Sequence, residues 1–286
     1  MTETGATTNP PSNGNGKEPK IYFLPNLFTA GNLFCGFLAL TRIVEADLSQ
    51  GYGPIQEALL LILLACIFDA LDGRVARMGG YESPFGREFD SLADIVSFGV
   101  APAFLVHKVV LKDVFVIRGV DHSEIGWFIA SMYVICGALR LARFNCLAAM
   151  PERENDKEFV GFPIPAAAGL VASVTLLLIW MERRDFVAPV QWKYALPVLL
   201  VFLSIMMVSR VKYPTFKRID WRAPRSFAKM VFAALLVGFF FTVGRHYLPL
   251  VMPVIFISYL VYGFVRPFIS RRMRRDIEED LAEAQP

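Results

Sequence analysis

Apolar blocks of about 20 residues recur along the chain, and their length restricts the possible folds more than any other feature. The hydrocarbon core of a bilayer is about 30 Å thick, and an α-helix of about 20 residues spans it. The chain has 286 residues, 55% of them hydrophobic, with a mean hydropathy of +0.46. The sequence therefore predicts an all-α, polytopic membrane helix bundle. A large soluble helical protein is disfavoured, because such proteins rarely carry so many blocks of this length.

The blocks predict about eight transmembrane helices. Boundary signals support the early ones: Gly79-Gly80 ends the second block, and Ser83-Pro84 opens the third as a helix cap followed by a first-turn proline. The expected helices cover residues 25–46, 54–78, 84–111, 124–149, 163–182, 193–211, 226–244 and 247–266.

The distribution of basic residues predicts the orientation of these helices. With eight spans, most of the 29 Lys and Arg residues fall on the side that holds both termini. Loops that remain in the cytoplasm carry the excess of Lys and Arg, so both termini and the loop between the second and third spans are expected to be cytoplasmic. A different parity of spans would destroy this alternation.

Four aspartates interrupt the second and third apolar blocks. Asp69 and Asp72 are three residues apart, and Asp90 and Asp94 are four apart, so each pair shares one helix face. An aspartate in the middle of a membrane helix costs roughly 2.5–3.5 kcal/mol, and such acids usually face the protein interior and serve a function. A tight hairpin between the two helices would join both pairs in one acidic pocket.

Carboxylates without nearby His or Cys form a ligand set for hard cations such as Mg²⁺ or Mn²⁺. Two ions about 3.5–4 Å apart would suit phosphoryl chemistry. Two other interpretations use the same acids. One is a structural ion-pair network with Arg74, Arg77 and Arg87, and the other is a cation transporter. Transport is disfavoured because the acids gather at one end, and Glu45 and Asp47 stand alone on the far side.

The spacing D-x-x-D-G-x-x-A-R-x8-G-x-x-x-D-x-x-x-D resembles the signature of the CDP-alcohol phosphotransferases, which use a hydroxyl acceptor to displace CMP from a CDP-linked lipid or alcohol. All fixed positions are present: Asp69, Asp72, Gly73, Ala76, Arg77, Gly86, Asp90 and Asp94. The flanking segments are similar to those of the CDP-diacylglycerol–serine phosphatidyltransferases, the phosphatidylserine synthases. These flanks are residues 25–29, 31–32, 97–102, 140–145 and 161–165, and the resemblance covers roughly residues 21–170.

The resemblance implies roles for individual residues. Two metal ions, Mg²⁺ or Mn²⁺, would be held by Asp69, Asp72, Asp90 and Asp94, with Asp94 also the catalytic base for the acceptor hydroxyl. CDP-diacylglycerol would be bound by Asn32, Gly73, Arg77, Ser83 and Gly86. The acceptor would be bound by Arg140, Arg143 and Asn145, although arginines at a helix end also snorkel to the interface without binding a substrate.

The resemblance further implies the substrates CDP-diacylglycerol and L-serine, an active site on the cytoplasmic side of the cell (inner) membrane, and a homodimer; no nucleic acid is expected. Glycerol 3-phosphate, inositol phosphate or choline remain alternative acceptors, although a phosphorylated acceptor needs a denser basic pocket. The expected organisation is a disordered tail at 1–20, catalytic helices at 21–182, additional transmembrane helices at 183–269 and a charged tail at 270–286.

Overall fold

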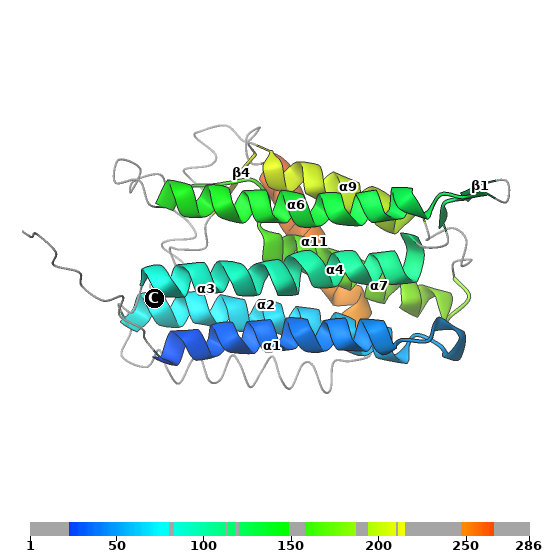
Figure 1. The fold of residues 1–286 in the computed structure, drawn as a ribbon, viewed down its shortest axis with the longest axis horizontal. Coiled ribbons are helices and arrows are strands. Elements are labelled where there is room, and N and C mark those ends of the chain that lie inside the picture. Colours follow the sequence, from blue (N-terminus) through cyan, green and yellow to red (C-terminus); the bar gives the residue numbers. More distant parts are fainter. Residues whose placement is uncertain are drawn as a thin grey trace, which may run out of the picture.

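The computed structural model describes residues 23–79, 83–111, 114–117, 120–148, 158–186, 194–209, 211–214 and 247–265. Within these ranges the molecule is a bundle of helices, and most of the long ones run roughly parallel to one another (Figure 1). Two pairs of very short antiparallel strands lie between helices: β1 (Val116–Ile117) with β2 (Val120–Asp121), and β3 (Glu158–Val160) with β4 (Lys212–Pro214). The predicted all-α membrane architecture is confirmed.

The helices follow the apolar blocks of the sequence. They are α1 (Phe23–Glu45), the short 3₁₀-helix η1 (Leu48–Gln50), α2 (Gly53–Gly79), α3 (Pro84–Asp94), η2 (Ile95–Val100), α4 (Ala101–Val106), η3 (His107–Leu111), α6 (Ser123–Ala148), α7 (Ile164–Glu182), α9 (Ala195–Val208) and α11 (Leu248–Val265).

Five helical stretches are long and apolar enough to cross a membrane: residues 26–45, 53–76, 84–111, 123–147 and 164–182. They coincide with the first five expected spans. The sixth and eighth expected spans are the shorter apolar helices α9 and α11. The expected span at 226–244 lies outside the described residues, as do both expected tails. The count of eight and the orientation therefore stay predictions.

The third span is one continuous helical stretch built from α3, η2, α4 and η3. The side chain of Ser83 caps its start by accepting a hydrogen bond from the Gly86 amide at 3.0 Å, as the Ser-Pro signal predicted. Two segments, η2 and η3, have π-helical geometry. The first begins directly after Asp94, and π-helical turns often occur at functional sites.

Helix α1 approaches this span very closely at Gly36. A Cβ atom at Gly36 would lie 2.2 Å from the Ser97 hydroxyl oxygen and 2.7 Å from the Ser97 Cα in η2. The absence of a side chain at Gly36 therefore permits the close contact that brings α1 beside the aspartate-bearing helices.

We expect Gly36→Ala to destabilise the folded protein by about 1–3 kcal/mol, because the new methyl group has no space against the backbone of Ser97. Thermal unfolding in detergent measures the effect. Gly53→Ala is the matched control, since a Cβ at Gly53 meets nothing within 4 Å. Equal melting temperatures for the two variants would contradict this account of the helix crossing.

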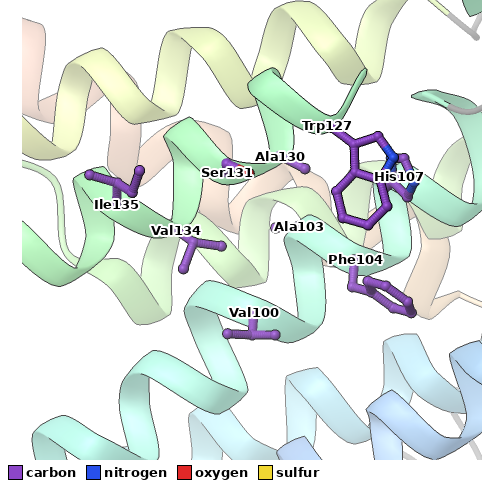
Figure 2. A pocket seen from close by; sticks show the side chains of 9 residues that line it. All are labelled: Val100, Ala103, Phe104, His107, Trp127, Ala130, Ser131, Val134 and Ile135. Atoms are coloured by element: carbon purple, nitrogen blue, oxygen red, sulfur yellow. The ribbon is translucent and has the colours of Figure 1, made fainter. Parts of the chain in front are cut away.

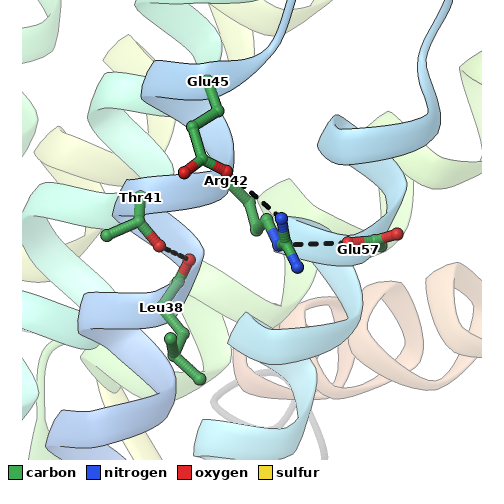
Figure 3. Close-up of polar contacts among 5 residues, drawn as sticks. All are labelled: Leu38, Thr41, Arg42, Glu45 and Glu57. Atoms are coloured by element: carbon green, nitrogen blue, oxygen red, sulfur yellow. Dashed lines mark hydrogen bonds and ion pairs between the residues drawn. The ribbon is translucent and has the colours of Figure 1, made fainter.

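The ends of α1 and α2 remote from the aspartates carry their own polar contacts. Arg42 forms ion pairs with Glu45 at 3.2 Å and with Glu57 at 3.1 Å, joining the two helices (Figure 3). Asp47 caps η1, and the hydrogen bond from the Ser49 hydroxyl is the main cause that lowers the pKa of its carboxyl group. The acids on this side thus have local structural partners, and exposed pairs of this kind contribute little stability.

Candidate active site

Three carboxylates from α2 and α3 converge in one place. Asp69, Asp90 and Asp94 each offer an oxygen, and these oxygens lie within 4.8 Å of one another. Asp94 is buried, and the other two are partly buried. The spacing of the aspartates predicted a convergence between the second and third spans, and the structure confirms it for these three residues.

Asp72 is arranged differently from the other three aspartates. It is buried, it is not a member of the tight group, and its Oδ2 atom accepts a hydrogen bond from the hydroxyl group of Thr29 in α1. It remains within electrostatic range of Asp90. From the sequence we expected four carboxylates in one pocket and no role for Thr29, although Thr29 lies in one of the flanking segments.

The group of three fits a divalent cation. The Oδ1 atom of Asp90 is buried and has no hydrogen-bond partner among the described residues. Within the same part of the chain, neither Asp90 nor Asp94 forms an ion pair, whereas Arg42 pairs with Glu45 and Glu57. Carboxylates this close repel one another unless something offsets their charge. An all-oxygen set favours a hard divalent cation, so the cluster could bind one, and the ion-pair interpretation explains these two acids poorly.

Asp94 has the most elaborate surroundings of the three. Its Oδ1 atom accepts a hydrogen bond of 3.1 Å from the side-chain amide of Asn32, a fully buried residue of α1. The hydroxyl of Ser97 donates to the main-chain carbonyl of Asn32 at 3.0 Å, which fixes α1 against η2 at this level. The positive charge of Arg140, from α6, also acts on Asp94.

The residues expected at the donor side lie along the start of α3 and the end of α2. Ser83 caps α3, and a Cβ at Gly86 would lie 3.2 Å from the Ser83 hydroxyl and 3.5 Å from the Asn26 side-chain oxygen. Gly73 lies in α2, one residue after Asp72. Arg77 is also in α2, but its side chain lies outside the described residues.

The three residues expected at the acceptor side separate in the structure. Arg140 is buried and near the carboxylates. Arg143 donates hydrogen bonds to the main-chain carbonyls of Val208 and Ser209 at the end of α9, at 3.3 and 3.5 Å. The Asn145 amide donates to Ser91 at 3.0 Å and to the carboxylate of Glu88, both in α3. Arg143 and Asn145 thus hold α6 against its neighbours.

An apolar cavity of about 420 Å³ lies between the third span and α6 (Figure 2). The part of the third span that lines it, residues 100–107, follows Asp94 in the sequence. Its lining residues are Val100, Ala103, Phe104, His107, Trp127, Ala130, Ser131, Val134 and Ile135. None of them is an acid, so this cavity is not the site of the carboxylate chemistry. His107 and Trp127 close one end of it with their rings 4.6 Å apart.

Comparison with known proteins agrees with this geometry. The family model described as CDP-alcohol phosphatidyltransferase matches residues 22–208. The CDP-diacylglycerol–serine O-phosphatidyltransferase of Helicobacter pylori is 34% identical over 247 residues, which cover 86% of this chain and 91% of that protein. The archaetidylserine synthase of Methanothermobacter thermautotrophicus is 33% identical over 193 residues, which cover 67% of this chain and 69% of that protein.

A third similar protein comes from a eukaryote. The CDP-diacylglycerol–serine O-phosphatidyltransferase of Saccharomyces cerevisiae is 37% identical over 152 residues, which cover 52% of this chain and 51% of that protein. The family match contains the helices that carry the aspartates, Asn32 and Arg140. The chain belongs to the CDP-alcohol phosphatidyltransferase family.

Proposed function

We propose that this integral membrane protein transfers the phosphatidyl group of CDP-diacylglycerol to the hydroxyl group of L-serine, forming phosphatidylserine and CMP. The observation that carries the proposal is the similarity to serine phosphatidyltransferases over most of the chain, one of them covered to 91% of its length. The converging carboxylates of Asp69, Asp90 and Asp94 agree with it, because this chemistry needs the charge of a diphosphate to be offset.

Asp69, Asp90 and Asp94 would hold Mg²⁺ or Mn²⁺, and Asp72 would complete the set for two ions. When bound, the cations offset the diphosphate charge and polarise the phosphorus under attack. The Thr29 hydroxyl holds one oxygen of Asp72, so it would set the direction in which the other oxygen faces.

Asp94 would accept the proton of the serine hydroxyl. The hydroxyl oxygen then forms a bond to the phosphorus that carries diacylglycerol, and the bond from this phosphorus to the oxygen of CMP breaks. Asn32 donates to one oxygen of Asp94, which leaves the second carboxylate oxygen for the proton. The proposal needs Asp94 to be ionised before attack.

The donor would lie along Gly73, Arg77, Ser83 and Gly86. Glycines let a nucleotide approach the backbone, and the planar guanidinium of an arginine binds phosphate oxygens in pairs. On the acceptor side, Arg140 would pair with the serine carboxylate. Arg143 and Asn145, for which the resemblance implied the same role, donate hydrogen bonds to α9 and α3 and would support the site from outside.

The setting of the enzyme is also part of the proposal. The active site would face the cytoplasm at the cell (inner) membrane, since the basic residues predict that side for both termini. Residues 21–182 would form the catalytic unit, 183–269 would add transmembrane helices, and 1–20 and 270–286 would be tails. A homodimer is the proposed assembly.

The direct test is a transfer assay with purified protein, labelled L-serine, CDP-diacylglycerol and Mg²⁺ or Mn²⁺. We expect labelled phosphatidylserine and an equal amount of CMP. Glycerol 3-phosphate, inositol phosphate and choline are the comparison acceptors. Transfer to one of them but not to serine would overturn the proposed acceptor and keep the family chemistry, whereas no CMP release with any acceptor would overturn the reaction.

A further inference from the structure

Two buried polar atoms beside Asp94 have no hydrogen-bond partner among the described residues. One is the side-chain carbonyl oxygen of Asn32, a residue with no exposed surface, and the other is Nε of Arg140, which is 8% exposed. Buried polar groups are nearly always paired, because leaving one unpaired in an apolar bundle is costly. Two such atoms near one carboxylate therefore indicate a polar ligand.

The chemistry of the two atoms is opposite. The carbonyl oxygen of Asn32 only accepts hydrogen bonds, and Nε of Arg140 only donates. Both residues are related to Asp94, Asn32 through a hydrogen bond of 3.1 Å and Arg140 through its charge. A ligand that satisfies both must carry a donor and an anionic acceptor on one small molecule, and it must fit beside the carboxylate that takes the proton.

The neighbours of Asn32 fix which of its atoms is free. The Asn32 amide directs its NH₂ group to Oδ1 of Asp94, so its carbonyl oxygen is the atom without a partner among the described residues. The Ser97 hydroxyl holds the main chain of Asn32, and the close contact at Gly36 prevents α1 from shifting. The free oxygen is therefore held rigidly.

We propose that Asn32 is a specificity residue for the acceptor, and that its side-chain oxygen binds the α-ammonium group of the amino acid while Arg140 pairs with the carboxylate. This inference rests on the proposed function and deepens it. The two residues together select a free α-amino acid that bears a hydroxyl group. The role differs from the donor-binding role that the sequence resemblance implied for Asn32, because the amide contacts Asp94 and not the Ser83–Gly86 turn.

The test uses two analogues that each lack one charged group of serine. 3-Hydroxypropanoate keeps the hydroxyl and the carboxylate, and ethanolamine keeps the hydroxyl and the ammonium. Each is titrated as a competitor of labelled serine at saturating CDP-diacylglycerol, with the full-length protein. For the unsubstituted enzyme we expect both analogues to bind at least about 10-fold more weakly than serine, the usual effect of leaving a charged hydrogen bond unmade. Binding of 3-hydroxypropanoate as tight as that of serine would overturn the proposal.

Substitutions assign each group to its residue. Asn32→Ala should weaken the binding of serine and of ethanolamine by about 10- to 100-fold and leave the binding of 3-hydroxypropanoate unchanged. Arg140→Leu should weaken the binding of serine and of 3-hydroxypropanoate and leave the binding of ethanolamine unchanged. If the alanine variant folds poorly, Asn32→Ser takes its place, because the serine hydroxyl can still donate a hydrogen bond to Asp94. We expect it to give the same pattern of binding changes. Thr41→Val is the control in the same helix, because the Thr41 hydroxyl bonds only within α1.

Two results with the Asn32 variant would also overturn the inference. If Asn32→Ala weakens all three acceptors by the same factor, Asn32 only supports Asp94. If Asn32→Ala instead raises the KM for CDP-diacylglycerol, Asn32 belongs to the donor side. Failure of the proposed function is a separate result, because it shows as an unsubstituted enzyme that forms no lipid from serine.

Discussion

Removal of divalent cations should abolish phosphatidylserine formation completely, and added Mg²⁺ or Mn²⁺ should restore it. Asp69, Asp90 and Asp94 bring three carboxylates within 4.8 Å, and the free Asp90 oxygen has no protein partner among the described residues. These carboxylates repel one another and the donor diphosphate, so electrostatic repulsion prevents the donor from binding there when no cation is bound. The measurement is CMP release after treatment with EDTA, followed by titration of each metal.

Two variants test whether the metal acts at this cluster. Asp69→Asn removes one ligand charge, and we expect it to raise the metal concentration needed for half-maximal activity by at least about 10-fold. Asp47→Asn is the control, because Asp47 caps η1 at the opposite end of the helices. Full activity after stringent chelation would contradict the metal assignment and would revive the ion-pair interpretation of these aspartates.

The sequence was sufficient to predict that Asp69, Asp90 and Asp94 converge, although it placed Asp72 in the same group and the structure does not. Residues three or four apart share a helix face, so Asp90 and Asp94 lie on the same face independently of the tertiary structure. The Ser83-Pro84 start signal fixes where the third span begins, and a short connection to the second span leaves few ways to arrange the two helices. Both the apolar block length and the motif spacing are local properties, and local properties can be read from a chain without its tertiary structure.

The partners of these acids could not be predicted in this way. Thr29 and Asn32 lie in α1, about 40 and 60 residues from Asp72 and Asp94, and they meet them only because Gly36 lets α1 pack against η2. Such contacts depend on the rotation of one helix against another, which hydrophobic periodicity leaves loosely defined for a helix such as α1 that is apolar nearly all round. The π-helical turn after Asp94 likewise has no distinctive sequence signal.

Arg140 and Arg143 show the same limit within one helix. They are three residues apart near one end of α6, and the sequence treats them alike. The side chain of Arg140 is buried near the carboxylates, whereas Arg143 reaches the carbonyl groups at the end of α9. A step of three residues turns the helix by about 300°, so a difference of roughly 60° in direction separates a side chain near the carboxylates from one that bonds to α9.

Replacement of Asp94 by asparagine should lower turnover by two to four orders of magnitude, on the order of the loss that follows removal of a general base. The amide keeps the shape of the side chain but cannot take a proton from the acceptor hydroxyl. Affinity for CDP-diacylglycerol should stay near normal, because Asp69 and Asp90 remain to hold the cation. The side-chain oxygen of an asparagine at position 94 can still accept the hydrogen bond from the Asn32 amide, so the contact between α1 and the third span is preserved.

The contrast with Asp69→Asn decides between the two roles of Asp94. Asp69→Asn should weaken metal binding and turnover together, whereas Asp94→Asn should lose turnover at every metal concentration. Binding of Mn²⁺ and of CDP-diacylglycerol is therefore measured for both variants beside their rates. If Asp94→Asn needs as much additional metal as Asp69→Asn, and recovers its rate when that metal is supplied, then Asp94 acts chiefly as a ligand. The proton of serine must in that case go to another group, and Asp90, whose free oxygen lies in the same cluster, is the residue to substitute next.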